Sequence, residues 1–243
     1  RGAYDELVEG KIQIESGEDE LTAAMTSYYT FKSVIDSTGL SQSEMISMIS
    51  KAETLAEEYL TIVSEIESIA IDTITDPAAI YNLLVQAETK LEELDDSLFY
   101  LRVLSYLLET YTGIDLDFVV SALDDFIDNI KDKLQILKAI VENTTISEDD
   151  KTKIKEVVEL FIDTKSTITT IKSVLSSAKT GVNTIFNKLA TAKAQLDDNM
   201  DKLEDAKRQL ADGYEQYVSG KAQLASAQSE YNTKKLEAEN ELS

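Results

Sequence analysis

The sequence predicts an all-α protein in which an elongated antiparallel two-helix coiled-coil stalk carries a four-helix-bundle head, with five helices in total. Three observations lead to this prediction. One heptad position stays apolar or aromatic from Ile154 to Tyr231, small residues occupy the position three residues later in the second half of that stretch, and the same pattern returns near the N-terminus. A seven-residue spacing held this long requires a helix whose apolar face never turns away from its partner. No β pattern competes.

The seam of the predicted stalk is the set of heptad positions at which large and small side chains alternate in both terminal segments. In an antiparallel pair each large side chain can lie over a small residue of the other helix. Four glycines fall on this seam, although glycine inside a helix costs about 1 kcal/mol relative to alanine. Glycine as flexible punctuation is the alternative, and the unbroken heptad argues against it. The predicted seam residues are Leu7, Gly10, Ile14, Gly17, Leu21, Ala24, Tyr28, Ala206, Leu210, Gly213, Tyr217, Gly220, Leu224, Ala227 and Tyr231.

Large-on-small matching also predicts the register of the two stalk segments, to within one heptad. In the first register Leu21 lies over Gly220, and this register also places Tyr28 over Gly213, Ile35 on Ala206 and Ile14 on Ala227. In the second, Leu21 lies over Gly213 and Ile14 over Gly220. Either register would bring the two terminal segments side by side.

The first two helices follow from their end signals. The first is predicted from near Tyr4 to Asp36, and it stops around Gly39, a residue suited to a helix C-terminus. Ser41 with Glu44 forms a capping box that begins the second helix. The inward face of the second helix consists of apolar residues at helical spacing: Met45, Ile49, Ala52, Leu55, Tyr59, Val63 and Ile66.

The remaining three helices are predicted in the same way. Asp76 followed by Pro77 begins the third helix, which ends near Gly113. Asp115 caps a fourth, and Ser147 with Asp150 opens the long fifth helix. The inward residues of the third helix are Ile80, Leu84, Ala87, Leu91, Leu94, Leu98, Leu101 and Leu108, and those of the fourth are Leu116, Val119, Leu123, Phe126, Ile130, Leu134, Leu137 and Val141.

Helix lengths predict the domain organisation. At about 1.5 Å per residue the fifth helix would reach roughly 140 Å if unbroken, far longer than the others. The stalk is therefore assigned to residues 1–38 and 190–243, and the helical-bundle head to residues 39–189. Gly181 is the predicted place for a bend in the long helix, although it lies off the seam.

Composition excludes several function classes. The chain of 243 residues has one Pro, no Cys, no His and a net charge of −23. This charge opposes binding to nucleic acid, and the missing side chains remove the usual nucleophile, zinc and haem sites. Asp124, Asp125 and Asp128 could hold a hard cation, but no calcium-loop spacing accompanies them, so we interpret them as a solvated acidic face. We predict no catalytic residues, no cofactor and no metal.

Tyrosine is the one enriched aromatic residue. Seam tyrosines are explained by core packing, but Tyr100, Tyr106 and Tyr111 belong to one end of the third helix. They could mark a patch for a binding partner. Their alternative role is ordinary packing.

The two terminal segments carry a family resemblance. The stretches AYDELVEGKIQIESGEDEL (residues 3–21) and ADGYEQYVSGKAQLASAQSEYNTKKLEAENEL (residues 211–242) resemble the coiled-coil insert of large FtsX/MacB-like ABC transporter permeases of Gram-positive bacteria. In those proteins the insert lies outside the cell, between the first and second transmembrane helices. The resemblance covers the stalk segments, and the head is interpreted from physical arguments alone.

The resemblance implies a function. It implies a non-enzymatic extracellular domain, a soluble fragment of a membrane protein whose ends return to the same face of the bacterial cell membrane. Its partners would be the transmembrane part of the permease, a cytoplasmic ATPase subunit and an extracellular protein, peptide or cell-wall component. The absence of an initiator Met fits an excised piece. The alternative is a static stalk or an adhesion or phage-receptor-like ectodomain of a YhgE/Pip-like or MMPL-like membrane protein, and a cytoplasmic coiled-coil organiser is a third possibility.

Overall fold

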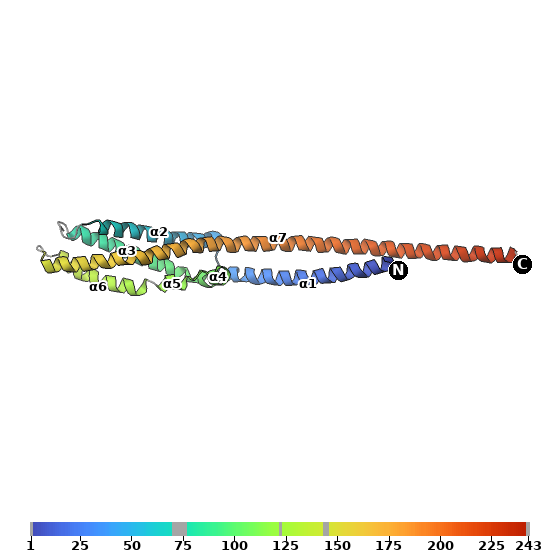
Figure 1. Ribbon diagram of the computed structural model, residues 1–243, viewed down its shortest axis with the longest axis horizontal. Helices are drawn as coiled ribbons and strands as arrows, with labels where there is room; N and C mark the ends of the chain where they lie inside the picture. The colour runs from blue at the N-terminus through green and yellow to red at the C-terminus, as the bar shows by residue number, and fades with distance from the viewer. Residues whose placement is uncertain (1, 70–76, 122, 143–145, 242–243) are drawn as a thin grey trace. The chain divides into compact units, whose positions relative to one another are not determined.

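The computed structural model describes residues 2–69, 77–121, 123–142 and 146–241, and all regular structure in these ranges is helical (Figure 1). The prediction of an all-α chain is confirmed. The predicted count of five helices is wrong, because the third and fourth predicted helices are each divided in two. The helices are α1 (Gly2–Asp36), α2 (Gln42–Glu67), α3 (Pro77–Tyr100), α4 (Arg102–Thr112), α5 (Asp117–Ser121), α6 (Asp124–Val141) and α7 (Glu148–Glu241).

The two additional breaks lie at buried leucines. Around Leu101 the backbone makes a tight turn, in which the Leu104 amide donates to the Leu101 carbonyl at 2.9 Å, and α4 begins at the next residue. Leu123 precedes α6 in the same way, with the Phe126 amide donating to its carbonyl at 3.0 Å. Burial of both leucines stabilises these turns, and no glycine or proline stands at either one.

The break before α6 also changes which residues face inward. Phe126 and Val141 were predicted to be inward residues but are only half-buried, whereas their neighbours Ile127 and Ile140 are buried. The helix begins at Asp124 instead of near residue 116, so its apolar face is not continuous with that of α5. The prediction for these two positions is wrong for that reason.

The helix ends follow the sequence signals where the structure describes them. Ser41 and Glu44 make both hydrogen bonds of a capping box at the start of α2, and the Ser147 hydroxyl accepts from the Asp150 amide at 3.1 Å at the start of α7. At the C-terminal ends, Gly39 and Gly113 have φ values of +68° and +72°, which favour glycine. The predicted cap Asp76 lies outside the described residues.

The chain divides into two compact units. Unit 1 comprises residues 1–32 and 189–243, and unit 2 comprises residues 33–188. The helix α7 contributes to both units, whereas α2 to α6 belong to unit 2. The sequence analysis placed the divisions at 38/39 and 189/190.

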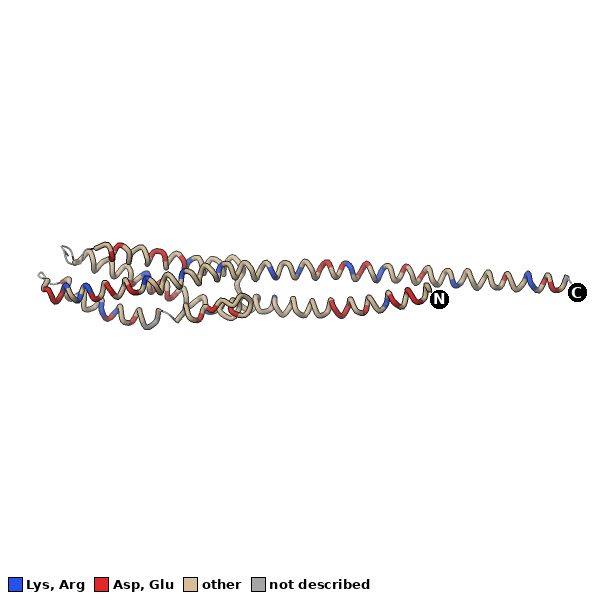
Figure 2. Tube along the Cα trace, in the orientation of Figure 1, with Lys and Arg blue, Asp and Glu red and all other residues tan. Residues whose placement is uncertain are grey.

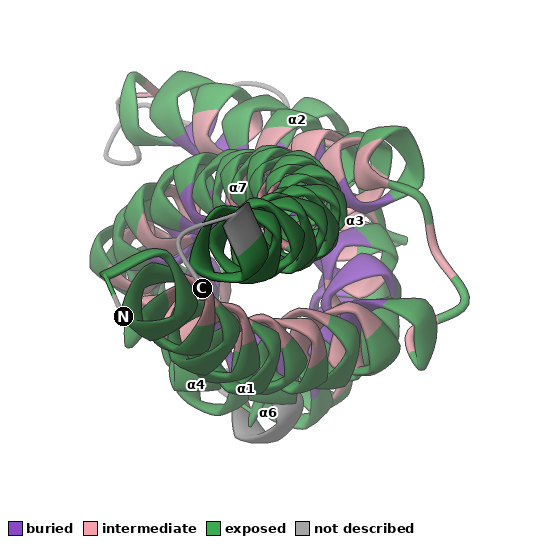
Figure 3. Cartoon of the chain, turned by 90° about the vertical axis from the view of Figure 1, so that its right-hand side faces the viewer, coloured by how far each residue is buried: buried purple, intermediate pink, exposed green. Residues whose placement is uncertain are grey.

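Unit 2 is built around an apolar core to which α2 to α6 and the first part of α7 contribute buried residues that face inward (Figure 3). All the predicted inward residues of α2 are buried. Each fully buried Leu or Ile contributes about 1.5–3 kcal/mol relative to exposure. Ion pairs lie at the margins of this core: Lys172 with Glu57 at 2.8 Å, Lys90 with Glu58 at 3.0 Å and Lys131 with Glu92 at 2.6 Å.

Gly181 lies at a close approach between helices. A Cβ atom there would lie 2.9 Å from both Ile114 Cδ1 and Leu108 Cδ2 and 3.3 Å from Thr112 Oγ1. Glycine at this position therefore lets α7 pack against the end of α4. The helix α7 continues through it as one element.

Unit 1 is a pair of helices, formed by α1 and the second part of α7. Leu196 is the one buried side chain among the described residues of this unit. Acidic and basic residues are interleaved along the α7 part (Figure 2). The predicted seam residues between Leu7 and Tyr28 are half-buried.

Candidate functional site

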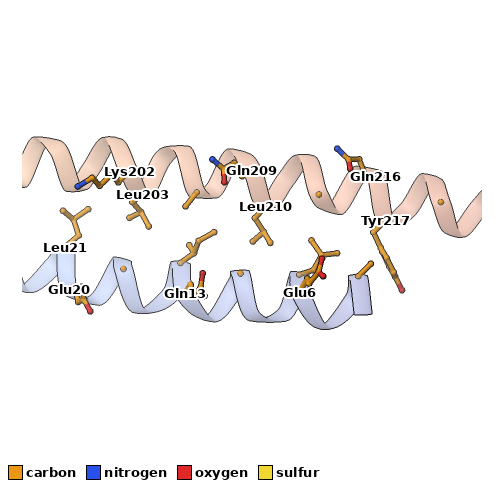
Figure 4. A pocket seen from close by; sticks show the side chains of 18 of the residues that line it. Glu6, Gln13, Glu20, Leu21, Lys202, Leu203, Gln209, Leu210, Gln216 and Tyr217 are labelled. Carbon is orange, nitrogen blue, oxygen red and sulfur yellow. The ribbon is translucent and has the colours of Figure 1, made fainter. Parts of the chain in front are cut away.

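The seam of unit 1 is where leucine side chains meet glycines across two helices. The Cβ position of Gly10 lies 3.3 Å from Leu210 Cδ1, that of Gly17 lies 3.3 Å from Leu203 Cδ1, and that of Gly213 lies 3.3 Å from Leu7 Cδ2. Residue numbers rise along α1 as they fall along α7, so the two helices run antiparallel (Figure 4). The large-on-small pairing expected from the sequence is present at these contacts.

The register differs from both predicted registers, which are wrong. Gly213 faces Leu7, whereas the first predicted register placed Tyr28 there and the second placed Leu21, three and two heptads further along α1. Gly220, which the two registers paired with Leu21 or Ile14, has no atom within 4 Å of its Cβ position. The physical reason is that registers displaced by whole heptads give nearly the same pairing of large and small residues. The observed register also brings Glu18 within 2.5 Å of Lys207.

Beyond Tyr217, the predicted seam of α7 has no partner within the described part of α1. The described part of α1 begins level with Tyr217, whose ring lies 6.1 Å from that of Tyr4. Leu224 is 68% exposed and Tyr231 is 64% exposed, and Gly220 and Ala227 are exposed as well. The observed register causes this difference from the prediction, because it places these residues of α7 beyond Gly2, the first described residue of α1.

A groove of about 1100 Å³ follows the seam on one side (Figure 4). Its floor is formed by seam residues, among them Leu203 and Leu210. Its edges are formed by two rows with seven-residue spacing: Glu6, Gln13 and Glu20 on α1, and Lys202, Gln209 and Gln216 on α7. The sequence analysis identified the seam but not these edges, although the seven-residue spacing of the edge residues was available as a signal.

The predicted tyrosine patch belongs to unit 2, with Tyr100 at the end of α3, Tyr106 within α4 and Tyr111 in the last turn of α4. Tyr100 is 67% exposed and Tyr106 is 66% exposed, whereas Tyr111 is half-buried. Two further exposed apolar residues, Phe99 at 57% and Val103 at 43%, lie beside Tyr100 and Arg102 in the chain, on the two sides of the turn at Leu101. Both were missed in the sequence, because their exposure depends on the fold. We call Phe99, Tyr100, Val103 and Tyr106 the aromatic stripe.

One cation accompanies the aromatic stripe. The Arg102 guanidinium carbon lies 4.9 Å above the centre of the Phe99 ring, within cation–π range. The rings of Phe99 and Tyr100 are 6.1 Å apart in an edge-to-face arrangement. This surface can stack on aromatic or apolar groups and can pair with an anion.

In the part of the chain that the structure describes, the titratable groups form no acid–base constellation. Burial raises the pKa of the Glu88 carboxyl, and the nearby Glu92 raises it further. Hydrogen bonding to Glu92 raises the pKa of Lys131, so this cluster is a network of ion pairs between α3 and α6. Among the described residues no group of three or more His, Cys, Asp or Glu side chains could hold a metal ion. The side chains of Asp124 and Asp125 lie outside what the structure describes.

Hydropathy and comparison with known proteins add two findings. Within the described ranges, each helix is either too short or too polar to cross a bilayer. No protein-family model, curated protein or solved structure matches this chain. Its function is therefore argued from the seam and the surfaces described above.

Proposed function

We propose that this chain is the non-enzymatic extracellular domain of a bacterial ABC transporter permease, and that it transmits conformational change between the membrane and a partner at the cell surface. The observation that carries this proposal is the antiparallel contact between α1 and α7 in unit 1, with Leu7 at Gly213 and Leu210 at Gly10. The resemblance to FtsX/MacB-like inserts leads us to expect this antiparallel arrangement in a coiled-coil stalk.

Nested side chains suit such a pair to transmitting force. A leucine seated against a glycine lets the two helix axes approach closely and resists sliding along the helices, because moving by less than a heptad sets leucine against bulkier residues. The Glu18–Lys207 ion pair, at 2.5 Å, joins the same two helices along one edge. Movement of one terminal segment would therefore be passed to the other.

The partners follow from the same proposal. The terminal segments would continue into the transmembrane part of the permease on the extracellular face of the bacterial membrane, and a cytoplasmic ATPase would move those membrane helices. Unit 2, as a helical-bundle head, would present the aromatic stripe to an extracellular protein, peptide or cell-wall component. Tyr100 and Tyr106 would make the central contacts, since both rings are largely exposed.

An insertion experiment in the whole transporter tests this proposal. Seven Gly/Ser residues inserted after Asp19 and after Asp201 would interrupt the pair at matching levels of the two helices. The control inserts at both places seven residues that repeat the local heptad, so that the seam continues. We expect the flexible insertions to abolish transport-coupled function with ATP binding unchanged, and the heptad insertions to retain function. Equal function in both variants would contradict the proposal.

The aromatic stripe favours a second candidate function. A static stalk or an adhesion or phage-receptor-like ectodomain of a YhgE/Pip-like or MMPL-like membrane protein would also use an exposed aromatic surface, and it would need no ATPase. In that case the flexible insertions would leave partner binding intact, whereas Tyr100→Ala with Tyr106→Ala would abolish it. An ATPase gene beside the gene for this chain favours the transporter.

A further inference from the structure

The groove in unit 1 exposes an apolar seam that the two helices do not enclose. Leu7, Leu203 and Leu210 are half-buried, and Leu196 is the one buried side chain among the described residues of the unit. In folded domains the apolar stripe of a helix is normally covered by another element. The groove side of this pair therefore lacks a covering layer within the described part of unit 1.

The charge of the groove differs from that of the chain. The chain carries 46 acidic and 23 basic residues, for a net charge of −23. The charged residues that line the groove are two glutamates, Glu6 and Glu20, and two lysines, Lys202 and Lys221, so its lining has no net charge. Because two copies of a strongly acidic chain repel each other, a neutral apolar surface is where they can approach.

We propose that the groove is the interface between two copies of this chain, whose helix pairs pack face to face into an antiparallel four-helix bundle. The two copies point in the same direction, so that α1 of each lies over α7 of the other. The apolar floors then cover each other, and the rows of Glu, Gln and Lys form the polar edges of the new core.

Charge pairing selects this orientation. Across the pair, positions 7 and 213 are level, and so are positions 10 and 210. Copies pointing the same way would set Glu20 beside Lys202 of the partner subunit and Gln13 beside Gln209 of the partner subunit, within about 3 Å along the axis. Copies pointing in opposite directions, with α1 over α1, would set Glu6 against Glu20 of the partner subunit, and like charges at such contacts are unfavourable.

Mass measurement on the full chain tests the association. At physiological salt we expect sedimentation equilibrium to give a concentration-dependent dimer, at twice the 27.0 kDa mass of the chain. Gln209→Glu combined with Gln216→Glu adds carboxylates at the groove edge, and it should raise the dimer dissociation constant at least tenfold. The control, Ala211→Glu with Ala222→Glu, adds the same charge on the opposite side of α7 and should leave the constant unchanged. Circular dichroism checks that helicity is retained.

Disulfide trapping tests the orientation, since the chain has no cysteine of its own. Chains carrying Gln13→Cys and chains carrying Gln209→Cys are mixed and oxidised, and we expect mixed disulfide dimers to predominate. A monomer at all concentrations, or equal dissociation constants for the edge variant and its control, would overturn the interface. Predominant Gln13→Cys homodimers would overturn the stated orientation. Neither measurement depends on a transport function.

Discussion

At the scale of single residues, the core of unit 2 contains a hydroxyl relay with a defined direction. The Thr164 hydroxyl donates to the Phe161 carbonyl at 2.6 Å, so the Tyr59 hydroxyl, 2.5 Å from Thr164 Oγ1, must be the donor in that contact. Both side chains are buried, and desolvation raises the pKa of Tyr59 far above its ordinary value. The phenol therefore stays protonated and serves as a donor.

Removing the Thr164 hydroxyl should lower the free energy of unfolding more than removing the Tyr59 hydroxyl. Thr164→Val leaves the buried Tyr59 hydroxyl without an acceptor, and we expect a loss of about 1–3 kcal/mol in the free energy of unfolding. Tyr59→Phe leaves Thr164 still bonded to the Phe161 carbonyl, and we expect a loss of about 1 kcal/mol. Urea denaturation measures both. Equal losses, or a larger loss for Tyr59→Phe, would show that the relay runs in the other direction.

Three glycines of α7 should respond differently to alanine, because their surroundings differ. Gly220 has nothing within 4 Å of its Cβ position, so Gly220→Ala should stabilise the local helix by up to about 1 kcal/mol. At Gly213 the same gain in helix stability is offset, because the added Cβ atom would lie 3.3 Å from Leu7 Cδ2. At Gly181 the 2.9 Å contacts with Ile114 and Leu108 should make Gly181→Ala destabilising by about 1–3 kcal/mol.

Amide hydrogen exchange near each site measures these changes, with thermal unfolding as a global check. From the most stabilising to the most destabilising, the expected order of the three variants is Gly220→Ala, Gly213→Ala and Gly181→Ala. A stabilising Gly181→Ala would mean that α7 and the end of α4 do not approach as closely as described.

At the scale of helices, the two capping boxes make helix starts sensitive to acid. Hydrogen bonds from Ser41 lower the pKa of the Glu44 carboxyl, and hydrogen bonds from Ser147 lower that of Asp150. A carboxyl with a lowered pKa in the folded state stabilises the fold above its unfolded pKa, and this contribution is lost as the pH falls through the folded value. Both helix starts should therefore weaken at acid pH.

A serine substitution isolates this effect at α2. The destabilisation caused by Ser41→Ala should be full at pH 7 and should shrink as the pH falls below the ordinary pKa of a glutamate. Ser47→Ala, on the exposed side of the same helix, should show no such trend. Free energies of unfolding of the three proteins between pH 3 and pH 7 check this, and a pH-independent effect of Ser41→Ala would contradict the role of Glu44.

The sequence predicts helix ends better than helix breaks, and the reason is physical. Local side chains mark the starts of α2, α3 and α7, at Gln42, Pro77 and Glu148. Gly113 marks the end of α4 in the same way. The breaks at Leu101 and Leu123 have no side-chain cap and no glycine or proline, and both leucines are buried, so no local pattern marks these breaks. The aromatic stripe was partly predicted for the same reason: Tyr100 and Tyr106 stand out by type, whereas Phe99 and Val103 are recognised once exposure is known.

At the scale of the whole molecule, the terminal segments of the chain come together in unit 1 while the intervening residues form unit 2. The antiparallel direction could be predicted, because large and small residues alternate in both segments. The register could not be predicted, because a heptad pattern repeats itself every seven residues and does not reveal the Glu18–Lys207 ion pair that accompanies the observed register. The groove edges, and with them the interface between copies, depend on that register.

The most direct test of the α1–α7 pairing is a set of spin-label distances. The chain has no cysteine, so labels can be placed at Glu18→Cys together with Lys207→Cys, Lys221→Cys or Gln228→Cys. The contact of Glu18 with Lys207 predicts the shortest distance for the first pair, and Lys221 should lie about 20 Å further along α7. A shortest distance at Lys221 or Gln228, or long distances in all three pairs with the labelled chains magnetically diluted, would contradict the antiparallel pairing in this register.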